Sequence, residues 1–152
     1  MKNKLLAYLK WSATVKTSWI GTVLRILVGL LLLLAGISHL TASSVEFAKL
    51  VPAWMPLSHT FIVLFSGLIE ILLGLALIAL SGKKVLFGWL TAIFLLLVFP
   101  ANINQYLNHI DAFGLETDQA RFMRLFFQPV LILWVLGSTA ALKSAIHYKS
   151  AR

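Results

Sequence analysis

The sequence has 152 residues, of which 60% are hydrophobic and only 12% are charged, and its formal net charge at pH 7 is +8. That composition lies well outside the range of ordinary globular domains. The lack of cysteine excludes disulfide exchange, thiolate nucleophiles and iron–sulfur clusters. The basic residues are dispersed along the chain, so the positive charge indicates no nucleic-acid partner.

Four apolar stretches follow one another, each close to the roughly 20 residues that a helix needs to cross a bilayer. They cover residues 20–40, 61–80, 85–101 and 125–142. We therefore expect a single all-α membrane domain over residues 1–152, an integral membrane four-helix bundle with up-down-up-down topology. The first stretch exceeds the apolar region of a signal peptide, so we expect it to remain in the mature protein.

The segments between the spans lead to four further expectations. The basic segment 1–18 is predicted to lie on the cytoplasmic surface of the membrane. In the first outer loop, Ser43 and Glu46 have the spacing of a capping box, which predicts a short interfacial helix. The short segment 81–84 allows only a tight hairpin between the second and third spans. Thr117 is the predicted N-cap of the helix that leads into the fourth span.

Cationic residues cluster at alternate ends of the spans. They precede the first span, occupy the hairpin between the second and third, and follow the fourth; they are Lys2, Lys4, Lys10, Lys16, Lys83, Lys84, Lys143, Lys149 and Arg152. In the other two loops, acidic residues outnumber basic ones. The positive-inside rule then predicts a multi-pass protein with both termini in the cytoplasm.

Two ionisable residues, Arg25 and Glu70, lie inside apolar spans, where an isolated charge is costly. Their predicted axial offset is roughly 7 Å at about 1.5 Å per residue, within reach of an extended arginine. We therefore expect a buried ion pair, which is either a ligand or proton-relay site or a lock on helix packing. Each charge lies on a stripe of small and polar residues, and the stripes are expected to face each other or share a cavity. The stripes are Arg25, Gly29, Leu32, Gly36 and His39, and Gly67, Glu70 and Gly74.

A second polar cluster is predicted where the outer ends of the spans meet. Its members are His39, Asn102, Arg124 and Gln128. Pro100 removes a backbone donor and is expected to free the carbonyl of Leu96 beside them. As a set these residues indicate a ligand site, whereas each one alone is explained as a helix cap or headgroup contact. Trp54 is predicted to be an interfacial anchor or a lid, and the histidine spacing predicts no metal site.

In their order and spacing, these segments resemble the DoxX family of small bacterial four-helix membrane proteins. The resemblance rests on Arg25-Ile-Leu-Val-Gly29, Ala35-Gly36-Ile-Ser-His39, Val51-Pro-Ala-Trp-Met-Pro56, Ser66-Gly67-Leu-Ile-Glu70, Phe99-Pro-Ala-Asn-Ile103 and Arg124-Leu-Phe-Phe-Gln128. One departure is Phe126, which stands where many members have a proline. The resemblance implies a bacterial inner-membrane bundle with Arg25, His39, Glu70 and Asn102 as functional positions.

Some DoxX relatives are associated with quinone-linked sulfur oxidation or with redox-stress complexes that contain soluble partners. The first hypothesis is therefore a redox- or quinone-associated accessory subunit, in which His39, Asn102 and Arg124 hold a quinone. A soluble or membrane redox partner would supply the electrons, so the chain is not expected to be an enzyme on its own. The alternatives are a small-solute transporter, expected to be a homo-oligomer because four helices make a thin wall, and an assembly factor or anchor without catalysis.

Overall fold

The computed structural model of the chain describes residues 8, 12 and 14–150, with side chains as far as Ile146. Its elements are α2 (Trp19–Leu40), α3 (Ser44–Leu50), α4 (His59–Ala79), the 3₁₀ turn η1 (Ser81–Lys83), α5 (Lys84–Leu107), α6 (Asp118–Ser138) and α7 (Ala141–Ser150). These described residues form helices and loops without a strand. The predicted surface segment 1–18 falls mostly outside the described residues.

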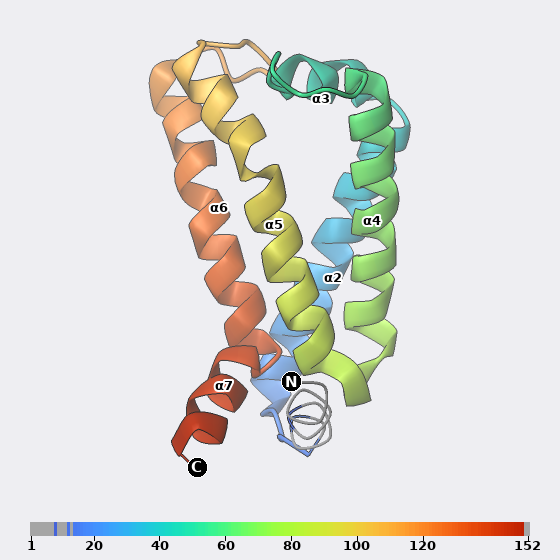
Figure 1. Cartoon of the computed structure of the whole chain (residues 1–152), viewed down its shortest axis with the longest axis vertical. Helices are drawn as coiled ribbons and strands as arrows, with labels where there is room; N and C mark the ends of the chain where they lie inside the picture. The colour runs from blue at the N-terminus through green and yellow to red at the C-terminus, as the bar shows by residue number, and fades with distance from the viewer. Residues whose placement is uncertain (1–7, 9–11, 13, 151–152) are drawn as a thin grey trace.

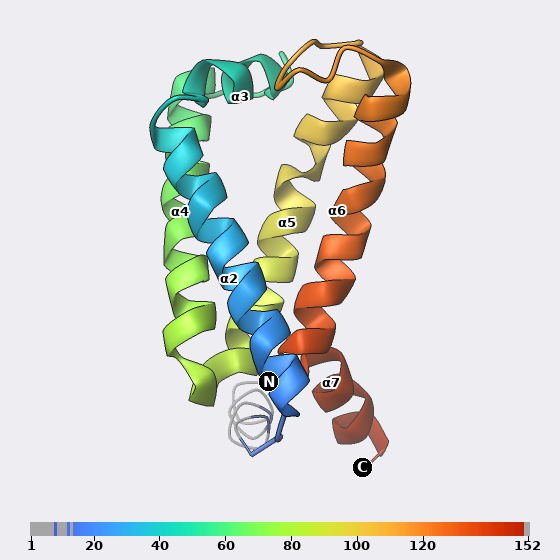
Figure 2. The same cartoon turned by 180° about the vertical axis from the view of Figure 1, so that it is seen from behind.

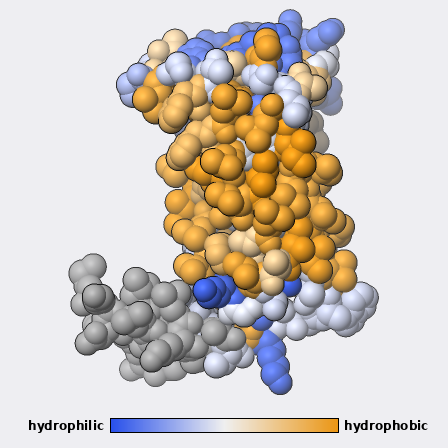
Figure 3. Space-filling model, turned by 90° about the vertical axis from the view of Figure 1, so that its right-hand side faces the viewer, coloured by the Kyte–Doolittle hydropathy of each residue, from blue (hydrophilic) through white to orange (hydrophobic). Residues whose placement is uncertain are grey.

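Four of the helical segments are long and apolar enough to cross a membrane, namely α2, α4, α5 together with η1, and α6. On the face shown in Figure 3, apolar side chains form a broad band across the middle of the molecule, and hydrophilic residues lie above and below it. Large apolar side chains such as Leu34 and Leu97 are 65% and 69% exposed. An all-α protein with four helices of membrane-spanning length, and a short helix in the first long loop, is therefore confirmed.

The helix boundaries agree with the prediction for α2 and α4 and differ for the other two. Helix α5 continues beyond residue 101 to Leu107, with Pro100 inside it, because one missing donor is tolerated in a helix that packs against neighbours. Helix α6 begins at Asp118, before the predicted start of the fourth span at residue 125, and it ends at Ser138, before the predicted end at residue 142. Its start is set by Thr117, whose hydroxyl accepts a hydrogen bond from the backbone of Ala120 at 3.2 Å, as predicted.

The predicted capping box at the start of α3 is wrong. Ser43 makes no side-chain capping bond. The carboxylate of Glu46 instead accepts hydrogen bonds from the Lys49 ammonium at 2.6 Å and from the backbone N–H of Phe113 at 3.3 Å. A charged donor is a stronger partner for a carboxylate than a neutral amide, so Glu46 turns away from its own helix start.

The spans are arranged as two tightly packed pairs. Helix α2 packs mainly on α4, and α5 packs mainly on α6. The first pair is antiparallel and joined by glycines: a Cβ on Gly29 would lie 2.9 Å from the carbonyl oxygen of Gly74, and one on Gly36 would lie 2.6 Å from that of Gly67. The predicted small-residue stripes therefore do face each other, because only glycine allows the backbones to approach this closely.

The two pairs meet at one end of the molecule and separate towards the other (Figures 1 and 2). At the end that carries η1 and α7, hereafter the α7 end, Val28, Leu77 and Val135 form a fully buried core. At the opposite end, hereafter the α3 end, α3 and the loop 108–117 bridge the pairs. The bundle is thus a wedge that is closed at the α7 end and covered at the α3 end.

Candidate functional site

A cavity of about 380 Å³ lies between the two helix pairs in the half of the wedge towards the α3 end. Most of its wall is aliphatic and is contributed by all four long helices; representative residues are Val28, Leu32, Leu95, Val98 and Leu131. The polar part of the wall is formed by His39, Ser66, Glu70, Asn102, Arg124 and Gln128. An apolar pocket of this size with a few convergent polar groups is typical of a small-molecule site.

The cavity brings together most of the residues that the sequence singled out. His39, Glu70, Asn102, Arg124 and Gln128 line it, although they come from two predicted clusters. The two remaining candidates lie elsewhere. Arg25 is at the α7 end, and Trp54 is 70% exposed on the loop between α3 and α4 and does not line the cavity.

His39 is held between a serine and the intramembrane carboxyl group. The hydroxyl of Ser66 donates to the carbonyl of Val63 at 2.9 Å, so its oxygen accepts from Nδ1–H of His39 at 3.0 Å. In the neutral imidazole, this tautomer leaves the lone pair of Nε2 facing Glu70, whose Oε2 is 3.8 Å away. That Oε2 is buried and has no hydrogen-bond partner among the described residues. The two groups are too far apart for a direct hydrogen bond, so a polar group of a ligand placed between them could bond to both.

The antiparallel arrangement of α2 and α4 explains why these two side chains converge. Side chains on a helix lean towards its N-terminus. Helix α2 begins at the α7 end, so His39 leans into the wedge, whereas α4 begins at the α3 end, so Glu70 leans towards His39. The histidine therefore reaches the carboxyl group across the glycine seam.

The predicted Arg25–Glu70 ion pair is wrong for the same geometrical reason. The glycine register places Arg25 level with Ile78, eight residues or about 12 Å along α4 from Glu70. Arg25 also leans towards the α7 end, where its guanidinium donates to the carbonyls of Leu77 and Ile78. These carbonyls belong to the last turn of α4, which lacks intrahelical donors and has a negative dipole end. Arg25 is thus a cap for α4.

An amide chain closes the opposite wall. The side chain of Asn102 donates to Oε1 of Gln128 at 3.0 Å, and Nε2 of Gln128 donates to the carbonyl of Leu95 at 2.8 Å. The carbonyl that Gln128 contacts is that of Leu95, next to the carbonyl of Leu96 that Pro100 is expected to free. The chain links α6 to α5 next to Pro100, where α5 has lost a backbone hydrogen bond.

Two arginines on successive turns of α6 differ sharply in their partners. Arg121 is 5% exposed and donates to the carboxylates of Asp111 and Asp118 and to the carbonyl of Glu116. Arg124 lines the cavity and lies 4.5 Å above the ring of Phe113. Within the described part of the chain, no carboxylate or hydrogen-bond acceptor contacts Arg124. It also interacts electrostatically with His39.

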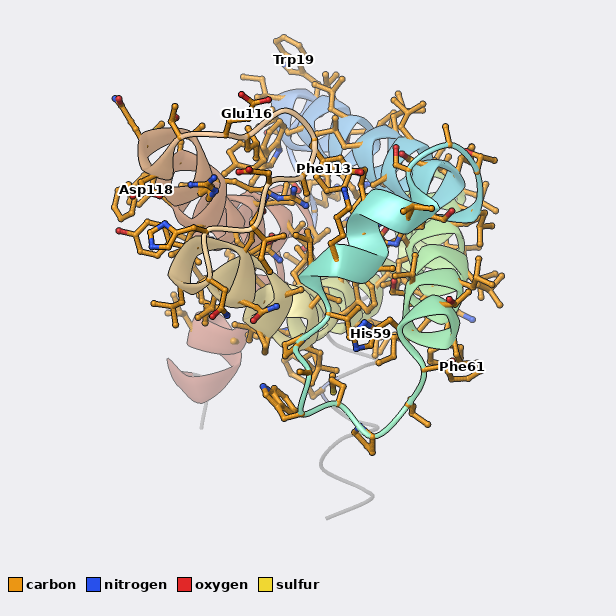
Figure 4. The ribbon with its side chains drawn as sticks, turned by 90° about the horizontal axis from the view of Figure 1, so that it is seen from above. Trp19, His59, Phe61, Phe113, Glu116 and Asp118 are labelled. Carbon is orange, nitrogen blue, oxygen red and sulfur yellow. The ribbon has the colours of Figure 1, made fainter. Side chains whose placement is uncertain are left out.

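The loop 108–117 and α3 together cover the cavity. The ring of Phe113 packs 4.5 Å from Phe47, which in turn lies 3.5 Å from the imidazole of His39. Looking onto this end, Figure 4 shows Phe113 beside α3 over the bundle, whereas Trp19 and Phe61 point outwards. The hydrogen bond from Lys49, aided by that from Phe113, lowers the pKa of Glu46, so this anchor of the loop is ionised at neutral pH.

The cavity is open sideways. Leu31 on α2, Phe127 on α6 and Leu97 on α5 line it and are also exposed on the apolar band. The openings lie where the two helix pairs separate, at the depth where lipid tails would surround the protein. Part of the cavity wall is therefore shared with the apolar outer surface of the bundle.

Sequence reasoning missed two residues of this site. Ser66 is one helical turn before Glu70 on the same face, and that spacing was a usable signal. Phe113 had none, because its place over the cavity depends on the fold of a loop in which it has a positive φ of 57°. Among the described residues, no group of three histidine or acidic side chains could hold a metal ion.

Comparison with known proteins assigns the family. The sequence matches the family described as Domain of unknown function (DUF8561) over residues 28–139. The chain belongs to this family. No curated protein and no solved structure matches it.

The resemblance to the DoxX family is therefore wrong. Its motifs were short, and glycines, prolines and isolated polar residues were their distinguishing positions. The structure uses several of them for packing, as between Gly36 and Gly67, and close helix approach requires such residues in unrelated bundles. The quinone-linked role that the resemblance implied loses its basis with it.

Proposed function

We propose that this protein is a membrane-embedded binding protein for a lipophilic small molecule. The observation that carries the proposal is the cavity between the helix pairs, where His39, Glu70, Asn102 and Arg124 meet at one end of an aliphatic chamber. The ligand's polar head lies among these four side chains, and its apolar part lies along the chamber. Hydrogen-bonding groups set the orientation, and burial of apolar surface supplies most of the affinity.

The lateral openings support entry from the bilayer. The protein would act by holding or presenting its ligand, as an accessory protein and not as an enzyme on its own. Both His39 and Glu70 can gain or lose a proton, which would let binding respond to the charge of the head group.

The test is to identify what the cavity carries. The full-length protein is purified in a mild detergent, and the bound small molecules are extracted and measured by mass spectrometry. We expect one class of lipophilic molecule in near-stoichiometric amount. A quinone in that fraction would identify a redox cofactor, and any other class would remove the redox hypothesis.

Two matched variants test whether the bound molecule lies in the cavity. Ala35→Phe adds a ring to the cavity wall, whereas Leu34→Phe adds one on the neighbouring, lipid-facing residue. We expect the first to lose the bound molecule and the second to keep it. Equal retention in both variants, or no bound molecule in the wild type, would reject the proposal.

We further propose an up-down-up-down bundle in the bacterial inner membrane, with both termini cytoplasmic. It is supported by the lysine-rich η1 turn and the positive-inside rule. Since the chain lacks cysteine, single substitutions can be labelled cleanly. A membrane-impermeant maleimide should label Trp54→Cys and Glu116→Cys in intact cells, and Gly82→Cys only after the membrane is opened. Labelling of Gly82→Cys in intact cells would reverse the orientation.

A further inference from the structure

We propose that the molecule held in the cavity is a single-chain amphipathic anion, whose carboxylate or phosphate is bound by Arg124. This inference rests on the proposed binding function and names its ligand class. The decisive feature is a guanidinium that lines a largely apolar cavity, stacks on an aromatic ring and donates no hydrogen bond to any of the described residues.

The other two arginines in the described part of the chain have oxygen partners. Arg25 donates to two backbone carbonyls at the end of α4, and Arg121 donates to two carboxylates and a carbonyl. Arg124 has only the π-face of Phe113 at 4.5 Å. A cation–π contact stabilises the charge but leaves the edge of the guanidinium, with its fork of N–H donors, available. Nε of Arg25 and of Arg121 also lacks a partner, but among the described residues Arg124 is the arginine whose guanidinium donates no hydrogen bond to an oxygen.

The charge of Arg124 decides between possible head groups. A cationic head would be repelled by the guanidinium. A neutral carbonyl would accept a hydrogen bond but leave the positive charge uncompensated near the apolar band. An oxyanion supplies both the charge and two oxygens for the planar fork, and such charge-assisted pairs are the stronger ones.

His39 and Glu70 complete the site. Oε2 of Glu70 is buried and has no hydrogen-bond partner among the residues that the structure describes, its side chain is 9% exposed, and Glu70 lines the cavity next to His39. Two negative charges at one buried position repel each other, so anion binding here requires Glu70 to carry its proton. Protonated Glu70 is a donor, and its Oε2 would then find a hydrogen-bond partner in the ligand. Glu70→Gln keeps the shape and a donor without the charge.

The size of the cavity favours one chain. About 380 Å³ is near the lower end of the roughly 300–1,000 Å³ of ordinary ligand pockets. Below the polar groups the wall is aliphatic, with Leu95, Val98 and Leu131 along it, and the lateral openings allow the end of a longer chain to extend into lipid. Fatty carboxylates and alkyl or prenyl phosphates share this chemistry.

The experiment compares head groups on one chain. Hexadecanoate, hexadecyl phosphate, hexadecanol and hexadecylamine are titrated separately onto the delipidated full-length protein, and binding is measured by native mass spectrometry. We expect at least one anion to bind about tenfold more tightly than the alcohol, which corresponds to about 1.4 kcal/mol, and the amine to bind most weakly. The tighter of the two anions identifies carboxylate or phosphate as the natural head.

Variants of the protein test which residue recognises the head group of the ligand. Arg124→Gln should reduce the preference for the anion over the alcohol to about twofold or less, while Arg124→Lys should retain part of it because the charge remains. Glu70→Gln should preserve the preference. Lys83→Gln, which removes the same charge from the exposed η1 turn, is the matched control and should behave as the wild type.

The outcomes separate this inference from the proposed function. The inference of an anionic ligand is rejected if hexadecanol binds the wild type as tightly as both anions, or if Arg124→Gln keeps the full preference. The proposed binding of a lipophilic molecule is retained in that case. If none of the four probes binds and Ala35→Phe changes nothing, the binding function itself fails. Circular dichroism and size-exclusion profiles equal to those of the wild type confirm that each variant is folded.

Discussion

The α7 end and the α3 end of the bundle are built from the same four helices but are packed in opposite ways. At the α7 end, Val28, Leu77 and Val135 fill the space between the pairs with almost no exposure. At the α3 end the pairs separate, the gap is lined by polar and aliphatic side chains, and a loop covers it. The tightly packed α7 end therefore supplies most of the packing energy that stabilises the bundle. Because of this, the α3 end can contain a cavity even in a protein of 152 residues.

The largest expected effect comes from truncating the core of the closed end. Leu77→Ala removes a side chain with 0% exposure, and we expect a loss of about 2–5 kcal/mol in the free energy of unfolding. Leu97→Ala makes the same change at a residue that lines the cavity and is 69% exposed, and should cost less than about 1 kcal/mol. Unfolding in detergent mixtures, followed by circular dichroism, measures both; equal losses would contradict the division into two ends.

A second prediction tests whether the wedge opens between the pairs and not within them. Gly36→Ala places a Cβ 2.6 Å from the carbonyl oxygen of Gly67 and 2.8 Å from Ile71, so α2 and α4 must move apart. Overpacking of this kind costs about 1–3 kcal/mol. Gly137→Ala is the control because nothing lies within 4 Å of its added Cβ. It should leave stability unchanged or raise it by up to about 1 kcal/mol; a similar loss at both sites would remove the glycine seam as the basis of the pair.

The fold of this protein was largely predictable because lipid imposes few solutions. Span length, the small-residue faces and the cap at Thr117 depend only on local sequence, and each was predicted from it. The sequence also predicted several of the residues that line the cavity. Isolated polar residues at span ends, such as His39 and Gln128, are energetically unfavourable in a membrane unless they have polar partners.

The pairing of those residues was not predictable, because it depends on register and side-chain direction. The sequence placed Arg25 within reach of Glu70, and a difference of a few residues in register sends the guanidinium to Leu77 instead. The loop that covers the cavity could not be predicted either. Phe113 reaches Phe47 and Arg124 only through the course of the loop, which no local pattern encodes.

A smaller effect on the free energy of unfolding is expected from removing the side-chain hydrogen bonds of Gln128 at the α3 end. Gln128→Leu keeps the volume but removes the donor to Leu95 and the acceptor for Asn102. Each hydrogen bond is worth about 0.5–1.5 kcal/mol, so we expect a total loss of about 1–2 kcal/mol, less than that at Leu77. The matched variant is Phe126→Leu, because Phe126 is 58% exposed and does not line the cavity, and it should leave the stability unchanged. If Gln128→Leu is as stable as the wild type, these hydrogen bonds position the side chains of the cavity wall but do not stabilise the fold.

The smallest effect concerns the cover itself and depends on pH. The pKa of Glu46 is lowered in the folded protein, chiefly by the hydrogen bond from Lys49, so the ionised carboxylate stabilises the anchored loop above the ordinary carboxyl pKa. That contribution is lost as the pH falls through the lowered value. We expect the NMR signal of the Phe113 amide, which donates to Glu46, to shift over that acidic range. Glu46→Gln should abolish this dependence and Glu116→Gln, in the same loop, should not. An unchanged titration in Glu46→Gln would mean that other contacts hold the loop, and that the two ends of the bundle differ in packing alone.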